Sequence, residues 1–218
     1  HDFYNASKFD FGTLLSDPDN IKENFEAYLQ GFSDNVIDII NHFKFQDQIK
    51  TLSDANLLYQ IISEFNSKKA DMSPAKITSN DMGYIFEELI RKFSESYDEE
   101  AGAHFTARDI IYLMAELLIV NEKEDIKANG CYKTAYDMAM GTSQMLGCLE
   151  ERLKEVNENA ELKLFGEELN EETFAIAKAD MLIKGGNADN MKYGDTLISG
   201  DSENPLKDEF RGYEFDYI

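Results

Sequence analysis

Cysteine and histidine are scarce in this sequence. Its 218 residues include two cysteines, Cys131 and Cys148, with no Cys-x-x-Cys motif, and three histidines. Structural zinc sites need four such ligands at short spacings, and disulfide scaffolds need several paired cysteines. The sequence therefore argues against a zinc centre and a disulfide framework, and it predicts no metal site.

Long apolar runs and positive charge are also in short supply. No apolar run approaches the roughly 20 residues that span a bilayer, and no signal peptide is recognisable, so we expect a cytoplasmic protein with no membrane partner. Lysine and arginine number 21 against 43 acidic residues, a formal charge of -22. Because DNA backbones are bound through Lys and Arg clusters, the chain is not expected to coat a nucleic acid by itself. A basic partner, or a small ligand in one pocket, stays open.

The first 125 or so residues have the apolar spacing of helices. Apolar residues make up 43% of the chain and charged residues 29%, a globular composition. Apolar positions recur at three- and four-residue steps, which is typical of amphipathic helices. Helices are predicted at residues 19–43, 57–65, 81–93 and 106–118. The first of these has a break at 31–33. Their apolar stripes are most simply explained as core packing.

Near residue 130 the apolar period changes from that of helices to that of alternating strands and helices. The predicted elements are a strand at 132–138, a helix at 143–157, a strand at 161–165, a helix at 171–184, a strand at 190–193 and a strand at 214–218. Such alternation predicts parallel βαβ units. We therefore predict an α/β protein with a helical domain over residues 1–100, followed over 101–218 by the first half of a Rossmann-like, doubly wound domain.

Three predicted strand ends carry residues suited to a nucleoside. Small residues at 137–144 would let the backbone approach a nucleotide, and the next helix offers free N–H groups. The pair Glu167 and Glu168 follows the second strand, at a place where a carboxylate can accept from both ribose hydroxyls. Asp195 follows the third strand and can accept from an adenine amino group. Each feature alone is more often a helix cap or turn, but ligands of parallel sheets bind at this edge, so together they favour a nucleoside-containing cofactor.

Several segments resemble one known family. Residues 82–90 read Met-Gly-Tyr-Ile-Phe-Glu-Glu-Leu-Ile, residues 99–106 read Glu-Glu-Ala-Gly-Ala-His-Phe-Thr, and residues 165–170 read Phe-Gly-Glu-Glu-Leu-Asn. Residues 56–59, 179–183 and 194–197 continue the match. In order and spacing, over nearly the whole chain, these segments resemble the modification (methyltransferase) subunit of type I restriction-modification enzymes.

The resemblance implies an S-adenosylmethionine-dependent enzyme that methylates the exocyclic amino group of adenine in duplex DNA. It also implies a truncated S-adenosylmethionine-dependent methyltransferase domain after the helical domain. The implied partners are a specificity subunit, a second modification subunit and a restriction subunit, with DNA bound only through that complex. By this resemblance Glu168 holds the ribose and Asp195 the adenine amino group. The other implied cofactor-binding residues are His104, Phe105, Thr106 and Arg108 near the methionine part, Asp137, Ala139, Gly141, Thr142, Ser143 and Gln144 in the first loop, and Thr196.

The loop at 137–144 departs from the family pattern. The family has Asp-Pro-x-x-Gly-x-Gly-Gly, whereas this chain has Asp-Met-Ala-Met-Gly-Thr-Ser-Gln. Ser143 and Gln144 thus replace glycines whose backbone takes angles that a Cβ obstructs. A misfit there is expected to cost about 1–3 kcal/mol, or roughly 5- to 150-fold in affinity.

The family's catalytic segment, Asn-Pro-Pro followed by Phe or Tyr, comes after the strand that residues 215–218 match. By this comparison the chain is expected to stop just before that segment, after Ile218. No catalytic residue is therefore assigned, and the 218-residue chain alone is expected to transfer no methyl group. An alternative function is that of an inactive remnant serving as an assembly or interaction module. Cofactor binding separates the two hypotheses.

Overall fold

The chain divides into two compact units. The computed structural model describes residues 3–73, 75–77, 81–82, 84–85, 88–89, 91–92, 106–199 and 201–218. One unit comprises His1–Ile85 with Leu182–Gly185, and the other comprises Phe86–Met181 with Gly186–Ile218. The predicted domain boundary between residues 100 and 101 lies outside the described residues, as does part of the predicted helix at 81–93.

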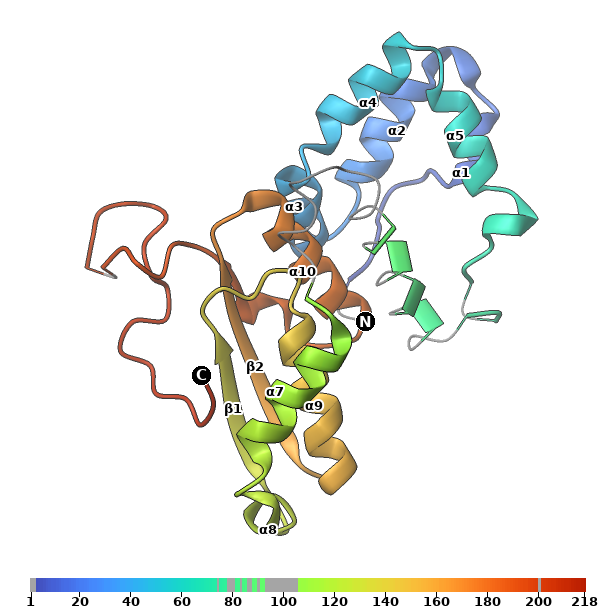
Figure 1. Ribbon diagram of the computed structural model, residues 1–218. Coiled ribbons are helices and arrows are strands. Elements are labelled where there is room, and N and C mark those ends of the chain that lie inside the picture. Colours follow the sequence, from blue (N-terminus) through green and yellow to red (C-terminus); the bar gives the residue numbers. More distant parts are fainter. Residues whose placement is uncertain are drawn as a thin grey trace. The chain divides into compact units, whose positions relative to one another are not determined.

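The first unit is helical, as predicted. Its described helices are α1 (Phe11–Leu15), α2 (Ile21–Gln30), α3 (Asp34–His42), α4 (Phe45–Asp54) and α5 (Leu58–Phe65) (Figure 1). The spacing of apolar residues did not separate α1 and α4 as helices of their own. Buried side chains from α1, α2, α4 and α5 form one core, made of Leu14, Ile21, Phe25, Leu29, Ile49, Leu58 and Ile62.

The predicted break at 31–33 separates α2 from α3, and Gly31 explains its position. The N-terminal segment crosses here, because the Ala6 N–H donates to the Gly31 carbonyl over 2.7 Å. A Cβ on Gly31 would lie 2.8 Å from the Ser7 backbone nitrogen and 2.5 Å from the Asn5 side-chain oxygen. Only glycine admits this close approach of two backbones.

The second unit alternates strands and helices, as predicted. Its described elements are α7 (Arg108–Ile119), α8 (Lys123–Ile126), β1 (Tyr132–Asp137), α9 (Gln144–Val156), β2 (Glu161–Glu168), α10 (Glu171–Ile183) and β3 (Met191–Tyr193). The three strands are parallel and lie in the order β1-β2-β3. Helix α9 packs on β1 and β2, and α7 packs along α9 (Figure 1). Within the described ranges, every helix is too short or too polar to span a bilayer.

The last residues extend the sheet beyond β1. Tyr217 forms a parallel bridge with Ala135, with the Tyr136 N–H donating to the Tyr217 carbonyl (2.9 Å) and the Tyr217 N–H donating to the Thr134 carbonyl (3.0 Å). The predicted closing strand is therefore present as a short pairing on the free edge of β1. This places β1 between β2 and the closing segment, which makes the end of β1 the topological switch point of the sheet.

Asp216 fastens the closing segment to β1, and its removal is expected to destabilise the second unit. Its carboxylate accepts from the Thr134 N–H (2.8 Å) and hydroxyl (2.9 Å) and lies 3.5 Å from the Lys133 ammonium. Because the Asp216 side chain is 39% exposed, we expect Asp216→Ala to cost only about 1 kcal/mol. A urea midpoint measured by circular dichroism tests this, with Glu214→Ala as the control because it makes the same charge change at an exposed neighbour.

The stability lost in Asp216→Ala is expected to depend on pH. Partial burial alone would raise the pKa of Asp216, but the bonds from Thr134 and the Lys133 charge outweigh it and hold the pKa below its ordinary value. A lowered folded-state pKa contributes stability above the unfolded pKa of about 4 and loses it as the pH falls through the folded value. The difference in urea midpoint between wild type and Asp216→Ala should therefore become smaller in acid. A difference that does not change with pH would contradict the stabilising role of the Asp216 carboxylate.

The core prediction for α7 is wrong for most of its apolar residues. Ile111, Ala115 and Ile119 are buried, at the four-residue spacing of one helix face. Four other apolar side chains of the helix are 48–64% exposed, namely Ile110, Leu113, Met114 and Leu117, while Leu118 is half-buried. Apolar residues run around most of α7, so the spacing could not indicate which single face packs against α9.

Candidate functional site

The carboxyl ends of the three strands meet at one edge of the sheet. Asp137 ends β1 opposite Gly166 of β2, and Glu168 ends β2 opposite Tyr193 of β3. The Gly194 N–H then donates to the Glu168 carbonyl over 3.1 Å, so the chain leading into Asp195 starts beside Glu168. The three predicted segments are therefore neighbours, in the order that the sequence predicted.

The loop after β1 folds back onto β2. The Met140 N–H donates to the Glu167 carbonyl over 3.0 Å, and the Gly141 N–H donates to Oε2 of Glu168 over 3.0 Å. Met140 is buried and lies directly over Gly166, where any Cβ would collide with the Met140 sulfur. A glycine in β2 thus makes room for the loop to approach the strand end closely.

The two residues that replace family glycines differ in their backbone. Ser143 has a φ of 68°, in the left-handed region, whereas Gln144 is the first residue of the α-helix α9. A serine in that region is strained by roughly 1–2 kcal/mol, but a helical glutamine is not. The expected obstruction by a Cβ is therefore confined to Ser143, while Gly141 retains its glycine at a φ of 55°.

Glu168 lies at the centre of this edge. Its Oε2 accepts from the Gly141 N–H (3.0 Å) and its Oε1 from the Asn170 N–H (2.8 Å). A carboxylate has about four acceptor positions, so Glu168 can accept two further hydrogen bonds. The side chain is half-buried, which fixes its direction and leaves it accessible to a ligand with neighbouring hydroxyls.

Asp195 and Asp137 flank Glu168. Oδ1 of Asp195 accepts from the Leu197 N–H over 2.9 Å, and the Asp195 N–H donates to the Leu206 carbonyl over 2.8 Å, so both side chain and backbone are oriented. Oδ1 of Asp137 accepts from the Ala139 N–H over 3.1 Å. Burial, with a smaller contribution from the Glu168 charge, raises the pKa of Asp137.

An exposed apolar side chain follows each acidic residue of the edge. Met138 comes after Asp137 and is 50% exposed, Leu169 comes after Glu168 and is 51% exposed, and Leu197 comes two residues after Asp195 and is 93% exposed. Large exposed apolar side chains that gather at a polar edge are typical of ligand sites. The sequence pattern did not predict a role for these three residues. The signal was nevertheless present, because at each strand end an acidic residue is followed within two positions by an apolar one.

The remaining predicted residues of this edge fall into two groups. Thr142 is buried, Thr196 is half-buried, and Ala139 is exposed, all in the loops described above. His104 and Phe105 lie outside the described residues, and Thr106 is exposed just before α7. The predictions for His104 and Phe105 therefore stay predictions.

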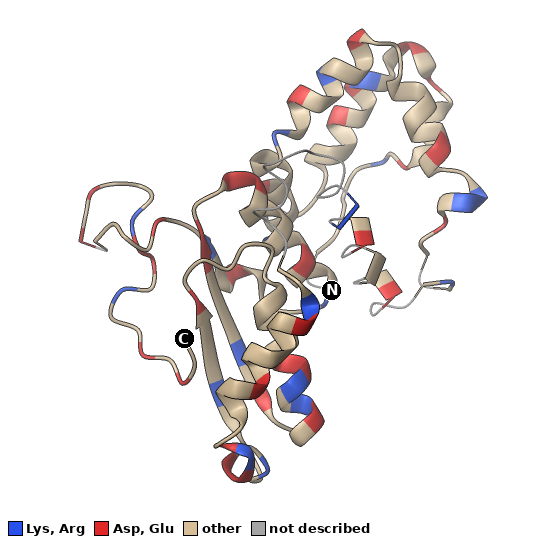
Figure 2. Cartoon of the chain, in the orientation of Figure 1, with Lys and Arg blue, Asp and Glu red and all other residues tan. Residues whose placement is uncertain are grey.

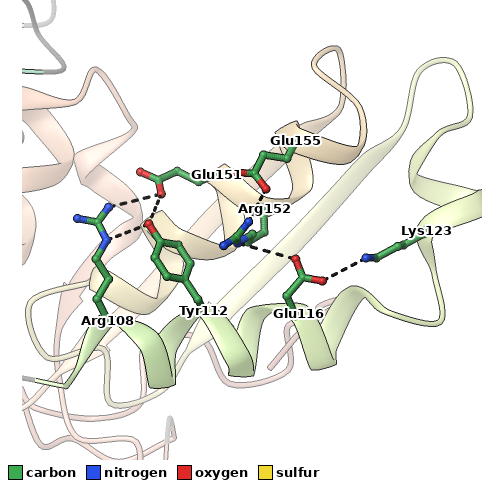
Figure 3. A network of polar contacts seen from close by, with 7 residues as sticks. All are labelled: Arg108, Tyr112, Glu116, Lys123, Glu151, Arg152 and Glu155. Carbon is green, nitrogen blue, oxygen red and sulfur yellow. Dashed lines mark hydrogen bonds and ion pairs between the residues drawn. The ribbon is translucent and has the colours of Figure 1, made fainter.

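Arg108 takes part in a network between α7 and α9 (Figure 3). Its Nε donates to the Tyr112 hydroxyl over 2.9 Å, and its guanidinium lies 3.6 Å from the carboxylate of Glu151 on α9. Further along, Arg152 pairs with Glu116 over 3.8 Å and stacks its guanidinium over the Tyr112 ring at 4.4 Å. Through these contacts Arg108 fastens the start of α7 to α9.

An apolar cavity of about 390 Å³ lies on the other side of Asp137, between α7, β1, α9 and the closing segment. Its lining residues are Met114, Leu117, Leu118, Ala135, Tyr136, Asp137, Met138, Met145, Leu146, Leu149, Tyr217 and Ile218. Asp137 is the one charged side chain among them. This lining lacks the several polar partners that a nucleoside needs, so the row of carboxylates is the better candidate site.

The charge of the edge limits its ligands. Figure 2 shows acidic residues at the end of β2 and in the loops that follow the strands. A row of carboxylates repels phosphate groups and attracts a cation. Among the described residues, no three side chains of the metal-ligating types gather closely enough to hold a metal ion. The arrangement therefore suits an organic ligand that combines hydroxyls, an amino group and positive charge.

Two known families match the chain. Residues 1–65 match the HsdM N-terminal domain, and residues 77–218, more than half of the chain, match the N-6 DNA Methylase family. Among curated proteins, none matches.

Two solved structures resemble the chain. One is the type I restriction-modification system methyltransferase subunit from Streptococcus thermophilus, with 17% identity, 92% of this chain and 42% of that chain covered, and a TM-score of 0.57. The other is a putative class I S-adenosylmethionine-dependent methyltransferase from Listeria monocytogenes, with 14% identity, 81% and 51% covered, and a TM-score of 0.44. The chain thus spans less than half the length of the Streptococcus subunit, whose likeness supports the fold. With an HsdM N-terminal domain ahead of its methylase region, the chain belongs to the N-6 DNA methylase family, in the group of modification (methyltransferase) subunits of type I restriction-modification enzymes.

Proposed function

We propose that the edge formed by Asp137, Glu168 and Asp195 binds S-adenosylmethionine, and that the chain is the cofactor-binding part of an adenine-specific DNA methyltransferase subunit. The observation that carries the proposal is Glu168, held between the Gly141 and Asn170 N–H groups with acceptor positions to spare. S-adenosylmethionine supplies a methyl group activated by a sulfonium. The residues of this chain bind and orient it.

The residues of the edge fit the nucleoside part of this cofactor. Glu168 would accept from the two ribose hydroxyls, and Asp195 would accept from the adenine amino group. Leu169 and Leu197 offer apolar surface for the adenine ring. The fit matches the usual division of a ligand site into apolar walls and a few oriented polar groups.

The methionine part is assigned to the loop from Asp137 to Gln144, together with the segment from His104 to Thr106 that the family resemblance implies. The loop lies close against β2, where Met140 packs over Gly166. The carboxylates of the edge also favour a sulfonium over a nucleotide phosphate. Charge therefore supports S-adenosylmethionine against ATP or a dinucleotide.

DNA is proposed to bind through a complex, because the chain carries a formal charge of -22. A specificity subunit would supply the basic surface, alongside a second modification subunit and a restriction subunit. In that complex the proposed reaction is methylation of the exocyclic amino group of adenine. The 218 residues contain no Asn-Pro-Pro segment, so the proposal for the chain itself is confined to cofactor binding.

Calorimetric titration with S-adenosylmethionine tests the proposal. We expect micromolar binding by the wild-type chain, weakened about 10- to 100-fold by Asp195→Asn, since one hydrogen bond to a charged group contributes about 1.5–3 kcal/mol. Asparagine keeps the oxygen that accepts from Leu197 and loses the charge. Asp189→Asn is the control, because Asp189 is exposed before the amino end of β3.

Lack of binding by a wild-type chain with a normal circular dichroism spectrum would refute the proposal. That result would favour the second candidate, an assembly or interaction module. The strained serine at position 143, at a φ of 68°, is the observation that favours this alternative, since it stands where the family has a glycine.

A further inference from the structure

Glu167 is a fully buried carboxyl group in the strand that carries Glu168. Side chains alternate along a strand, so Glu168 reaches the ligand edge while Glu167 points into the interior. Its relative exposure is 0%. Burying a carboxyl group costs several kcal/mol unless its oxygens are bonded, so its partners indicate what it does.

The partners of Glu167 come from two other segments of the unit. The Tyr136 hydroxyl, on β1, donates to Oε2 over 3.0 Å. The Glu209 N–H, in the loop after β3, donates to Oε1 over 3.3 Å. Gly194 lies directly against the same Oε1, so that a Cβ there would collide with it. One carboxyl group at the end of β2 thus contacts the end of β1 and two places, Gly194 and Glu209, in the segment that follows β3.

The segment that carries Asp195 is connected to this tie at two places. Glu209 belongs to the loop whose Leu206 carbonyl accepts from the Asp195 N–H over 2.8 Å. Gly194, against the Glu167 side chain, directly precedes Asp195. Asp195 is therefore linked to Glu167 both through the loop and through its own neighbour in the chain.

We propose that Glu167 is a positioning residue of the cofactor site, whose carboxyl group holds the segment after β3 against β1 and thereby orients Asp195 for the nucleoside. The inference rests on the proposed function and adds a residue that does not touch the ligand. Glutamine at this position keeps one accepting oxygen and a donor that can face the Tyr136 hydroxyl, whereas methionine keeps the volume and loses both bonds.

The groups around Glu167 also shift the pKa of its carboxyl group. Burial raises its pKa, and the Asp208 and Glu209 charges raise it further, against the bonds from Tyr136 and the Glu209 N–H, which lower it. Tyr136 itself has a raised pKa, so it stays a donor.

The test compares wild type, E167M and E167Q by titration with S-adenosylmethionine and by amide hydrogen exchange of the free chain. We expect E167M to weaken binding about tenfold, since it removes two hydrogen bonds, and to speed exchange at Asp195 and Glu209. E167Q should bind within about threefold of wild type, because it is the conservative variant that keeps an accepting oxygen. Glu161→Gln, exposed at the opposite end of β2, is the control.

Each outcome decides the inference. Unchanged affinity of E167M, with or without faster exchange, overturns it, and so does a loss of affinity in E167Q as large as that in E167M. If E167M does not fold, Tyr136→Phe takes its place. This variant removes the hydrogen bond from Tyr136 to Glu167 and is also expected to weaken binding of S-adenosylmethionine. Absence of binding by the folded wild-type chain would refute the proposed function itself, a result that none of the variants can mimic.

Discussion

Replacing Glu168 by glutamine is expected to weaken binding of S-adenosylmethionine by roughly two to four orders of magnitude. Two bonds from the ribose hydroxyls to a carboxylate contribute about 1.5–3 kcal/mol each, or about 3–6 kcal/mol together. Glutamine also turns an amide N–H₂ toward either the Gly141 or the Asn170 N–H, both of which are donors. The variant therefore loses ligand bonds and loosens the loop after β1.

Calorimetric titration and amide exchange at Gly141 measure these two effects separately. Glu172→Gln is the matched control, because Glu172 is exposed on α10 only four residues further along the chain. We expect the control to bind like wild type. A Kd for Glu168→Gln within about threefold of wild type, a difference below 1 kcal/mol, would show that the ligand does not use this carboxylate.

The edge of the sheet at the carboxyl ends of the strands was predictable because the sequence marks where the strands end. Apolar runs bounded by Gly or Asn give the strands, and parallel βαβ units bring their carboxyl ends to one edge. The exact end of β2 was harder. The prediction ended the strand at residue 165, whereas β2 continues to Glu168, so the alternation that separates the interior Glu167 from the edge residue Glu168 was not visible.

Two features could not be predicted because they depend on tertiary packing. The pattern at 137–144 made Ser143 and Gln144 equally unusual, but only the folded loop shows that one is left-handed and the other helical. Likewise, Glu209 is an ordinary acidic residue in the sequence. Its backbone N–H bonds Glu167 across 42 residues, a distance that local patterns do not encode.

The largest expected effect on stability is that of replacing Leu153, and Leu117 serves as its matched control. The sequence pattern does not distinguish these two leucines. Leu153 of α9 is fully buried, while Leu117 of the neighbouring helix α7 is 64% exposed. Leu153→Ala is expected to cost about 2–5 kcal/mol, because a buried leucine loses its transfer free energy and leaves a cavity. Leu117→Ala is expected to stay within about 0.5 kcal/mol, because little area changes and alanine favours a helix.

Urea midpoints of the two variants, followed by circular dichroism at several protein concentrations, measure the difference. Both variants remove the same three carbons from an α-helix, so only burial distinguishes them. If Leu117→Ala cost as much as Leu153→Ala, and the wild-type midpoint rose with concentration, the exposed face of α7 would be covered in solution by a second chain. If both costs were small, α9 would not form the core on which β1, β2 and the row of carboxylates depend.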